Sequence, residues 1–198
     1  MVIDVVHNTQ EVFRTILHCM SRPGTIKNID GIGSRMEQLE KCHHATFLSV
    51  MTLLDAEVSF HIIGGNAAVL EELFTAYTLS TATDLGQADY IFILQDAQPQ
   101  MIHEVFRRAK KGTLMNPQQS ATIIMETKKL SNDPLLTIRG PGIETMENVH
   151  IAESELWRFE RAEANQEYPL GVDMILIDCQ SNMMCLPRTT KFQDCEVS

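Results

Sequence analysis

An arginine beside two glycines is the first feature of this sequence that could bind an anion. Arg139-Gly-Pro-Gly142 follows a predicted strand, and glycines allow backbone N–H groups to approach a phosphate closely. The dinucleotide-binding fingerprint also requires a third glycine and the start of a helix, and this segment has neither. A tight turn after an edge strand explains the same residues, so the sequence leaves both interpretations open.

Histidines next to cysteines, at His18-Cys19 and Cys42-His43, raise the question of a zinc site. Zinc needs four ligands that converge as a tetrahedron, whereas adjacent side chains on a helix point about 100° apart. We therefore expect buried thiols and no metal site. The other histidines at 61, 103 and 150 are isolated, and no Gly-x-Ser-x-Gly motif or P-loop accompanies them. We expect no catalytic residues of those types.

Charge and hydropathy argue against two classes of partner. The 198 residues include 26 acidic and 16 basic side chains, for a formal net charge of −10, and an acidic surface repels nucleic acid unless basic residues cluster. Apolar runs such as 90–94 are far shorter than the roughly 20 residues of a membrane helix. The cysteines are odd in number and widely spaced, and no secretory signal is recognisable, so we expect a cytoplasmic protein.

Hydrophobic periodicity predicts the elements that must position these groups. Asn8 to Glu11 resembles a capping box that would start the first helix, and Ser131-Asn-Asp-Pro134 is a strong turn signal between two strands. Helices are predicted at about 8–20, 43–54, 69–77, 99–111 and 153–165, and strands at 57–63, 90–94, 121–126, 135–138, 172–177 and 183–186. Helices and strands alternate first and hairpins follow. We predict an α/β fold, a single domain over 1–198 with α/β/α layers around a mixed sheet.

Asp173 and Arg188 stand at the two ends of the predicted C-terminal hairpin. An ion pair between them would match the arginine fork to a carboxylate. Alternatively, Pro187 ends the strand and Arg188, Thr189 and Thr190 contact an anion or a partner subunit. Because few core side chains are expected beyond the last predicted strand, removal of the chain from Pro187 onward should harm assembly more than folding.

Several segments together resemble the PhnH family, a core subunit of the bacterial carbon–phosphorus lyase machinery. They are Phe13-Arg14 with Met20-Ser-Arg-Pro-Gly24, Leu136 to Ile143, and Tyr168 to Leu176 with Leu186-Pro-Arg-Thr-Thr190. Their order and spacing agree with the family over about residues 13–195. One segment departs from it, since Pro117-Gln-Gln-Ser-Ala-Thr122 stands where many members have Pro-Glu-x-Gly-Ala-Thr. We therefore assign no role to that acid here.

The resemblance implies a fold related to the large domain of pyridoxal-phosphate-dependent transferases, shortened and without the cofactor. It also implies a homodimer that joins PhnG, PhnI and PhnJ. That complex attaches a phosphonate to ribose triphosphate, displacing adenine from ATP, and then cleaves the carbon–phosphorus bond. The resemblance transfers no catalytic residue. The candidate contacts with a phosphorylated ligand or a partner are Arg22, Arg139, Asp173, Arg188, Thr189 and Thr190.

Two other functions stay open from the sequence. A stand-alone enzyme or binding protein would hold a phosphorylated small molecule through Arg139 or Arg188. An enzyme that kept pyridoxal phosphate would need a lysine, and Lys191 is the nearest candidate to the C-terminal motif. Several apolar runs compete for one modest core, which also favours a symmetric dimer.

Overall fold

The computed structural model describes residues 5–32 and 41–194. The helices are α1 Val5–Ser21, α2 His44–Leu53, α3 Ala67–Thr78, α4 Pro99–Arg108 and α5 Arg158–Ala164, with short 3-10 turns η1 Pro117–Gln119 and η2 Ser154–Leu156. The strands are β1 Lys27–Asn28, β2 Ser59–Ile63, β3 Thr81–Ala82, β4 Tyr90–Ile93, β5 Thr122–Thr127, β6 Leu130–Arg139, β7 Glu147–Ile151, β8 Asp173–Asp178, β9 Asn182–Leu186 and β10 Lys191–Phe192.

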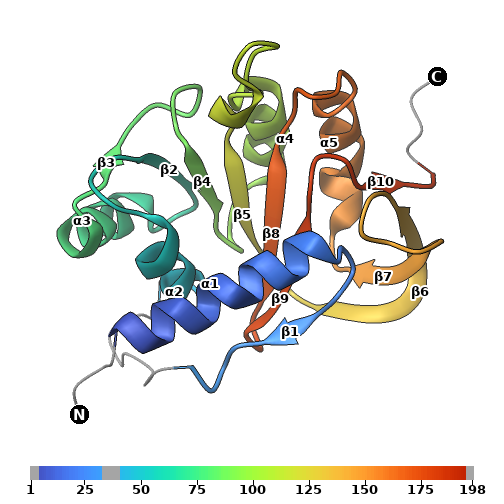
Figure 1. Ribbon diagram of the computed structural model, residues 1–198. Helices are drawn as coiled ribbons and strands as arrows, with labels where there is room; N and C mark the ends of the chain where they lie inside the picture. Colours follow the sequence, from blue (N-terminus) through green and yellow to red (C-terminus); the bar gives the residue numbers. More distant parts are fainter. Residues whose placement is uncertain (1–4, 33–40, 195–198) are drawn as a thin grey trace.

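Within these ranges the strands form one large and one small sheet (Figure 1). The large sheet has seven strands in the order β1-β9-β8-β5-β4-β2-β3, and the small one has three in the order β10-β6-β7. Strands β3, β2, β4, β5 and β8 run parallel to one another, whereas β9 pairs antiparallel with β8, and β1 pairs antiparallel with β9. The predicted α/β fold with a mixed sheet is therefore confirmed.

The central strands are buried on both faces because alternate side chains enter two separate cores. In β5, Ile123 packs in the core that includes α4, whereas Ile124 packs in the core that includes α1, α2 and α3. In β8, Met174 and Ile175 divide in the same way. A parallel strand covered on both faces is typically a continuous apolar run. The strand predicted at 90–94 is present as β4, and Ile91 and Phe92 enter the two cores in the same alternating way.

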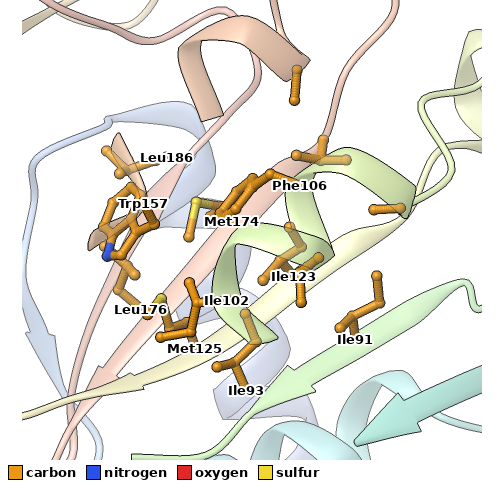
Figure 2. Packing of buried hydrophobic residues seen from close by; sticks show 14 of the residues in the cluster. Ile91, Ile93, Ile102, Phe106, Ile123, Met125, Trp157, Met174, Leu176 and Leu186 are labelled. Carbon is orange, nitrogen blue, oxygen red and sulfur yellow. The ribbon is translucent and has the colours of Figure 1, made fainter. Parts of the chain in front are cut away.

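Trp157 lies where α4 and the small sheet meet the large sheet (Figure 2). Its ring stacks on Phe106, with centroids 6.2 Å apart, and meets the ring of Phe192 edge-on at 6.0 Å. Trp157 is 1% and Phe192 2% exposed. Phe192 belongs to β10 and is the one apolar core side chain among residues 188–194, which agrees with the expectation that few lie beyond Pro187.

Two local signals were misleading. Helix α1 already begins at Val5, so the segment from Asn8 to Glu11 lies inside the helix and does not cap it. Ser131-Asn-Asp-Pro134 lies within β6, whose pairing with β7 shifts register between Ser131 and Leu136. An irregularity in the strand thus accommodates the turn-forming residues. As a result, β6 pairs with β7, which was not predicted, and not with β5.

The predicted helix over 153–165 is also interrupted. The chain forms the 3-10 turn η2, passes Trp157 at φ −148°, and begins α5 at Arg158.

No helix in the described ranges has the combination of length and hydropathy that a membrane span requires.

Candidate functional site

Three segments far apart in the sequence meet at one place, which we call the motif junction: Ser21–Gly24, Ile138–Ile143 and Pro187–Thr190. Gly140 and Gly142 adopt φ values of +149° and +87°. A Cβ atom on Gly140 would lie 2.8 Å from the carbonyl oxygen of Thr189, and one on Gly142 would collide with that of Ser21. Only glycine allows both the backbone conformation and the close approach. The glycines of the motif therefore serve packing between backbones.

The Arg139-Gly-Pro-Gly142 segment is a tight turn, one of the two interpretations from the sequence. The backbone N–H of Ile143 donates to the carbonyl of Gly140 at 3.1 Å. Its strand, β6, is central in the small sheet and not an edge strand, because β10 and β7 flank it. The side chain of Arg139 is exposed and lies directly opposite Lys191 across the β6–β10 pair.

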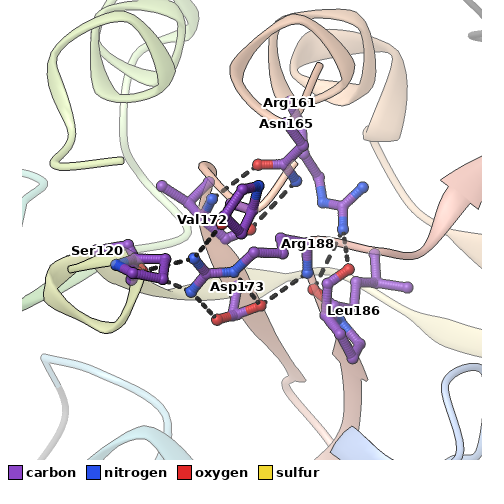
Figure 3. Close-up of polar contacts among 10 residues, drawn as sticks. Ser120, Arg161, Asn165, Val172, Asp173, Leu186 and Arg188 are labelled. Atoms are coloured by element: carbon purple, nitrogen blue, oxygen red, sulfur yellow. Dashed lines mark hydrogen bonds and ion pairs between the residues drawn. The ribbon is translucent and has the colours of Figure 1, made fainter. Parts of the chain in front are cut away.

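Arg188 is bonded on all sides within the fold (Figure 3). Its Nε and Nη2 donate to Asp173 Oδ1 and Oδ2 at 3.3 and 2.6 Å, and Nη1 donates to the carbonyls of Pro117 and Pro169 at 3.1 Å each. Nη2 also donates to Ser120 Oγ at 2.5 Å. The predicted Asp173–Arg188 pair is confirmed. Five N–H donors meet five acceptors, so in this conformation the guanidinium has no donor left for an anion.

The Arg188 contacts join three parts of the chain at the amino end of β8. Asp173 is the first residue of that strand, and Oδ1 also accepts the backbone N–H of Arg188 at 2.7 Å. Ser120 belongs to the segment 117–122 that departs from the family pattern, and its hydroxyl supplies an acceptor that a glycine would lack. The ion pair therefore fixes the direction of the chain after β9.

Arg161 was not among the predicted site residues, yet it holds the same junction from the other side. Its side chain is 1% exposed. Nη1 donates to the carbonyl of Thr190 at 2.9 Å, and Nη2 donates to those of Leu186 and Pro187 at 3.2 and 2.7 Å. Figure 3 shows Arg161 reaching from α5 toward Leu186. The C-terminal motif is therefore tied to α5 through its backbone carbonyls.

A signal for Arg161 was present in the sequence. Trp157, Arg161 and Ala164 recur at the i, i+4, i+7 spacing of one helix face, and all three are buried. An arginine in a helix rich in acidic residues is normally taken for a solvated side chain. Its burial depends on three carbonyls supplied by a distant loop, and no local pattern encodes them.

The remaining predicted residues divide between the interior and the surface. Thr190 is 1% exposed, and its Oγ1 has no hydrogen-bond partner among the described residues. Thr189 is half-buried and contributes its carbonyl to the contact with Gly140. Arg22 follows α1 and is exposed. The structure thus brings all six candidates to two adjoining regions, but only Arg22 and Arg139 present exposed side chains.

The carboxyl ends of the parallel strands, where open α/β sheets bind ligands, carry this chain's own carboxylates. Glu126 is 5% exposed and accepts the backbone N–H groups of His43 at 2.6 Å and Gln95 at 3.1 Å. Asp96 Oδ2 accepts the N–H of Gly65 at 3.1 Å. The N–H of His43 lies at the start of α2, that of Gln95 in the turn before α4, and that of Gly65 in the turn before α3. A phosphate at this edge would have to displace a carboxylate.

The thiol of Cys42 lies near this edge and is buried. Burial, together with the negative charge of Glu126, raises the pKa of Cys42 to about 12. A thiol that stays protonated at neutral pH is a poor nucleophile and a poor metal ligand. In residues 5–32 and 41–194, no group of three or more His, Cys, Asp or Glu side chains converges as a metal site requires.

A polar cavity of about 450 Å³ lies beside the loop that follows α4 and is lined by Lys110 and Lys111. Lys110 Nζ is 2.5 Å from Asp89 Oδ1, and Lys111 Nζ donates to the carbonyl of Arg107 at 3.1 Å. Burial raises the pKa of Asp89, but hydrogen bonds from Lys110 and Ser59 outweigh it and hold that pKa below its usual value. An anion in this cavity would therefore compete with Asp89 for Lys110.

The fold and the motif junction together define a class of protein. It is a three-layer α/β protein whose charged motif residues are bonded within the fold, with two exposed arginines beside them. The chain belongs to the PhnH family: the family model described as bacterial phosphonate metabolism protein (PhnH) matches residues 2–193. The family resemblance stated from the sequence is thereby confirmed.

Two relatives agree with this assignment. The chain is 26% identical over 211 aligned residues, 96% of this chain and 92% of the relative, to the alpha-D-ribose 1-methylphosphonate 5-triphosphate synthase subunit PhnH of Rhizobium meliloti (strain 1021). It is 38% identical over 80 residues, 40% of each chain, to the putative C-P lyase subunit protein HtxG of Stutzerimonas stutzeri.

Proposed function

We propose that this chain is a subunit of the carbon–phosphorus lyase core complex and acts in phosphonate utilisation. In that role it supports the formation of ribose 1-phosphonate 5-triphosphate from ATP and a phosphonate, the step before carbon–phosphorus cleavage. The observation that carries the proposal is the family match over residues 2–193, and both relatives are named as subunits of such an enzyme.

The geometry of the motif junction supports a role in assembly more than one in chemistry. Arg188, Asp173 and Arg161 are the buried or half-buried charged groups at and beside the junction, and the hydrogen bonds of their side chains described above lie within the fold. A residue that must bind or transfer a proton at an external atom needs a free donor or acceptor. The guanidinium of Arg188 has none in this conformation.

Within this proposal the partners are a second copy of the chain and the subunits PhnG, PhnI and PhnJ. Arg22 and Arg139 are the candidate residues that reach the surface and would contact a partner or a phosphorylated ligand, whereas Asp173, Arg188, Thr189 and Thr190 position them. The four described cysteines are free thiols, which supports a reducing compartment and hence the cytoplasm as the place of action.

Co-expression with PhnG, PhnI and PhnJ, followed by affinity purification and native mass spectrometry, tests the proposal. We expect the chain in a stoichiometric complex, and we expect the isolated chain to release no adenine from ATP in the presence of a phosphonate. Adenine release by the isolated chain would establish a stand-alone enzyme. Failure to enter any assembly with the three subunits would contradict the subunit role.

A further inference from the structure

The polar cavity of about 450 Å³ beside the loop after α4 lies at the amino end of β4. Asp89, directly before that strand, lines it together with Lys110 and Lys111. Open α/β sheets usually bind ligands at the carboxyl ends of their strands, but in this chain Glu126 and Asp96 occupy that edge. An anion would therefore meet the chain's own carboxylates at the carboxyl edge and two lysines at the amino edge.

The two lysines of this cavity keep most of their hydrogen-bond donors. Lys110 Nζ donates to Asp89 Oδ1 at 2.5 Å, and Lys111 Nζ donates to the carbonyl of Arg107 at 3.1 Å. An ammonium group has three N–H donors, so two remain on each lysine beyond these described bonds. Both lysines are half-buried, and a charge that water reaches less interacts more strongly with an opposite charge. Two such cations beside one cavity favour an anionic ligand.

Neutral donors lie next to the lysines. Thr113 lines the cavity, and its Oγ1 accepts the N–H of Asn116 at 3.0 Å, so the proton of the hydroxyl remains available to another acceptor. The exposed side-chain amides of Gln87 and Gln119 also line the cavity. An anion with several oxygens would thus find neutral N–H and O–H groups beside the two charged ones.

Asp89 both positions one lysine and limits the positive charge of the cavity. Its Oδ2 accepts the backbone N–H and the hydroxyl of Ser59 at 2.9 and 2.6 Å, which fixes the carboxylate, and its Oδ1 holds Lys110. Among the residues that line the cavity, two lysines stand against this one acid, so the lining is positive in a chain of net charge −10. Asp89 therefore holds Lys110 in place but also opposes an anion by like charge.

The residues of the family motif fix one wall of the cavity. Arg188 donates to the carbonyl of Pro117 at 3.1 Å and to Ser120 Oγ at 2.5 Å, on either side of the lining residue 119 (Figure 3). The N–H of Gly171 donates to the carbonyl of Lys111 at 3.0 Å. The internally bonded motif thus holds the segment 111–120 in a preformed shape, which reduces the cost of ordering it around a ligand.

We propose that this cavity binds the phosphoryl or phosphonyl group of a small molecule, with Lys110 and Lys111 as its charged contacts. Such a group carries up to two negative charges and three acceptor oxygens, which match two ammonium groups and several neutral donors. A carboxylate has one charge and two oxygens, and would leave part of this set unused. A cavity of this volume also has room for the organic part of the ligand. The inference rests on the proposed function, since it assigns to this subunit a site for the phosphorus compounds of the complex.

Titration of the purified full chain with inorganic phosphate, followed by phosphorus NMR line width, tests the cavity. The double variant Lys110→Gln/Lys111→Gln removes both charges and keeps polar side chains. Its matched control is Lys128→Gln/Lys129→Gln, an adjacent pair between β5 and β6 whose side chains are 60% and 59% exposed. We expect phosphate to bind the unchanged chain and the control with the same Kd, and to bind the cavity variant about tenfold more weakly or not at all.

Two single changes keep the test decisive if thermal melting shows that the double variant does not fold. Lys111→Gln removes a side chain whose described contact is one carbonyl, and should weaken phosphate binding several-fold. Asp89→Asn keeps an oxygen for Lys110 and removes the like charge, so phosphate should bind several-fold more tightly. A merely structural role of Asp89 would give no gain in affinity, and unchanged or weaker binding in Asp89→Asn would contradict the site.

Competition identifies the chemistry of the ligand and its source. Methylphosphonate represents a free phosphonate, ribose 5-phosphate represents a phosphate ester, and succinate represents carboxylates. We expect the first two to displace inorganic phosphate, and the one that binds more tightly indicates the source. Equal displacement by succinate would show a general anion site and overturn the assignment to a phosphorus group.

The outcomes separate this inference from the proposed function. If the unchanged chain binds no phosphate at millimolar concentrations, or if the cavity variant binds it like the control, the cavity site is refuted. The subunit role then still stands or falls on assembly with PhnG, PhnI and PhnJ. If the chain binds phosphate through the two lysines but enters no assembly, the subunit role fails and the cavity site stands.

Discussion

Replacement of Arg188 by alanine tests whether this residue stabilises the fold or serves as a contact on the surface. The change removes five side-chain hydrogen bonds, two of them to Asp173. The carboxylate of Asp173 keeps the backbone N–H of residue 188 at 2.7 Å. The carbonyls of Pro117 and Pro169 lose the donor that joined them. The consequence is a partly buried negative charge without its cation.

The exposure of the pair sets the size of the effect. The side chains of Arg188 and Asp173 are 16% and 24% exposed. Loss of one partner from a fully buried pair costs 3–5 kcal/mol, whereas an exposed pair contributes about 0–1 kcal/mol. Since some water still reaches both groups, we expect Arg188→Ala to lower the free energy of unfolding by about 2–3 kcal/mol. For a chain of this size that corresponds to a fall in Tm of roughly 4–12 °C.

Denaturant unfolding of four proteins measures the pair directly: the unchanged chain, Arg188→Ala, Asp173→Ala and the double variant. We expect a coupling energy of about 1–3 kcal/mol, as found for residues in one polar network. Arg188→Lys should recover only part of the loss because lysine keeps the charge without the planar fork. Arg107→Ala, an exposed arginine on α4, is the control and should leave Tm unchanged. An Arg188→Ala protein as stable as the unchanged chain, with a coupling energy near zero, would refute the reasoning.

Three further predictions follow from the described geometry. Gly140→Ala should lower Tm clearly, because of the positive φ and the collision with Thr189, whereas Gly31→Ala, with no atom within 4 Å of its Cβ position, should not. Thr190→Val keeps the shape and removes a hydroxyl without a described partner, so stability should be unchanged or rise by about 1 kcal/mol; a clear loss would indicate an unseen partner. A thiol reagent at neutral pH, followed by peptide mapping, should modify exposed Cys179 and spare Cys42; because the pKa of Cys42 is raised to about 12, its labelling in the folded protein should stay slow even in mildly alkaline buffer.

Local patterns predicted most of the elements near the functional residues. Pro99 begins α4, and Ile102, Val105 and Phe106 form its buried side, as their helical spacing indicates. The hairpin of β8 and β9 was predicted from a polar turn between two apolar runs, and the pairing of Arg188 with Asp173 was inferred from that hairpin. Such features depend on neighbours along the chain, where side-chain spacing and turn residues are sufficient.

Other predictions were wrong, or could not be made, because contacts with distant residues outweigh local preference. The turn signal at 131–134 falls inside β6, where residues 132–135 have no partner in β7 between the pairs Ser131–His150 and Leu136–Val149, so the turn-forming residues interrupt the pairing and do not end the strand. Helix α1 extends to Val5, beyond the capping box that was predicted to start it. The apolar residues of α3 are only partly buried, with Leu70 in the core and Val69 at 47% exposure. Periodicity gives one apolar side of a helix but not how much of it another element covers.

The sequence by itself determined the α/β class, the strands of the central sheet and the family. These follow from apolar periodicity and from motifs that are read along the chain. Only the tertiary structure decided what the motif residues do. The approach of Gly142 to Ser21, the three carbonyls around Arg161 and the full engagement of Arg188 each join segments that are far apart in the sequence. Because a buried charge is tolerated only where distant groups supply its hydrogen bonds, its place and its partners are set when the chain packs.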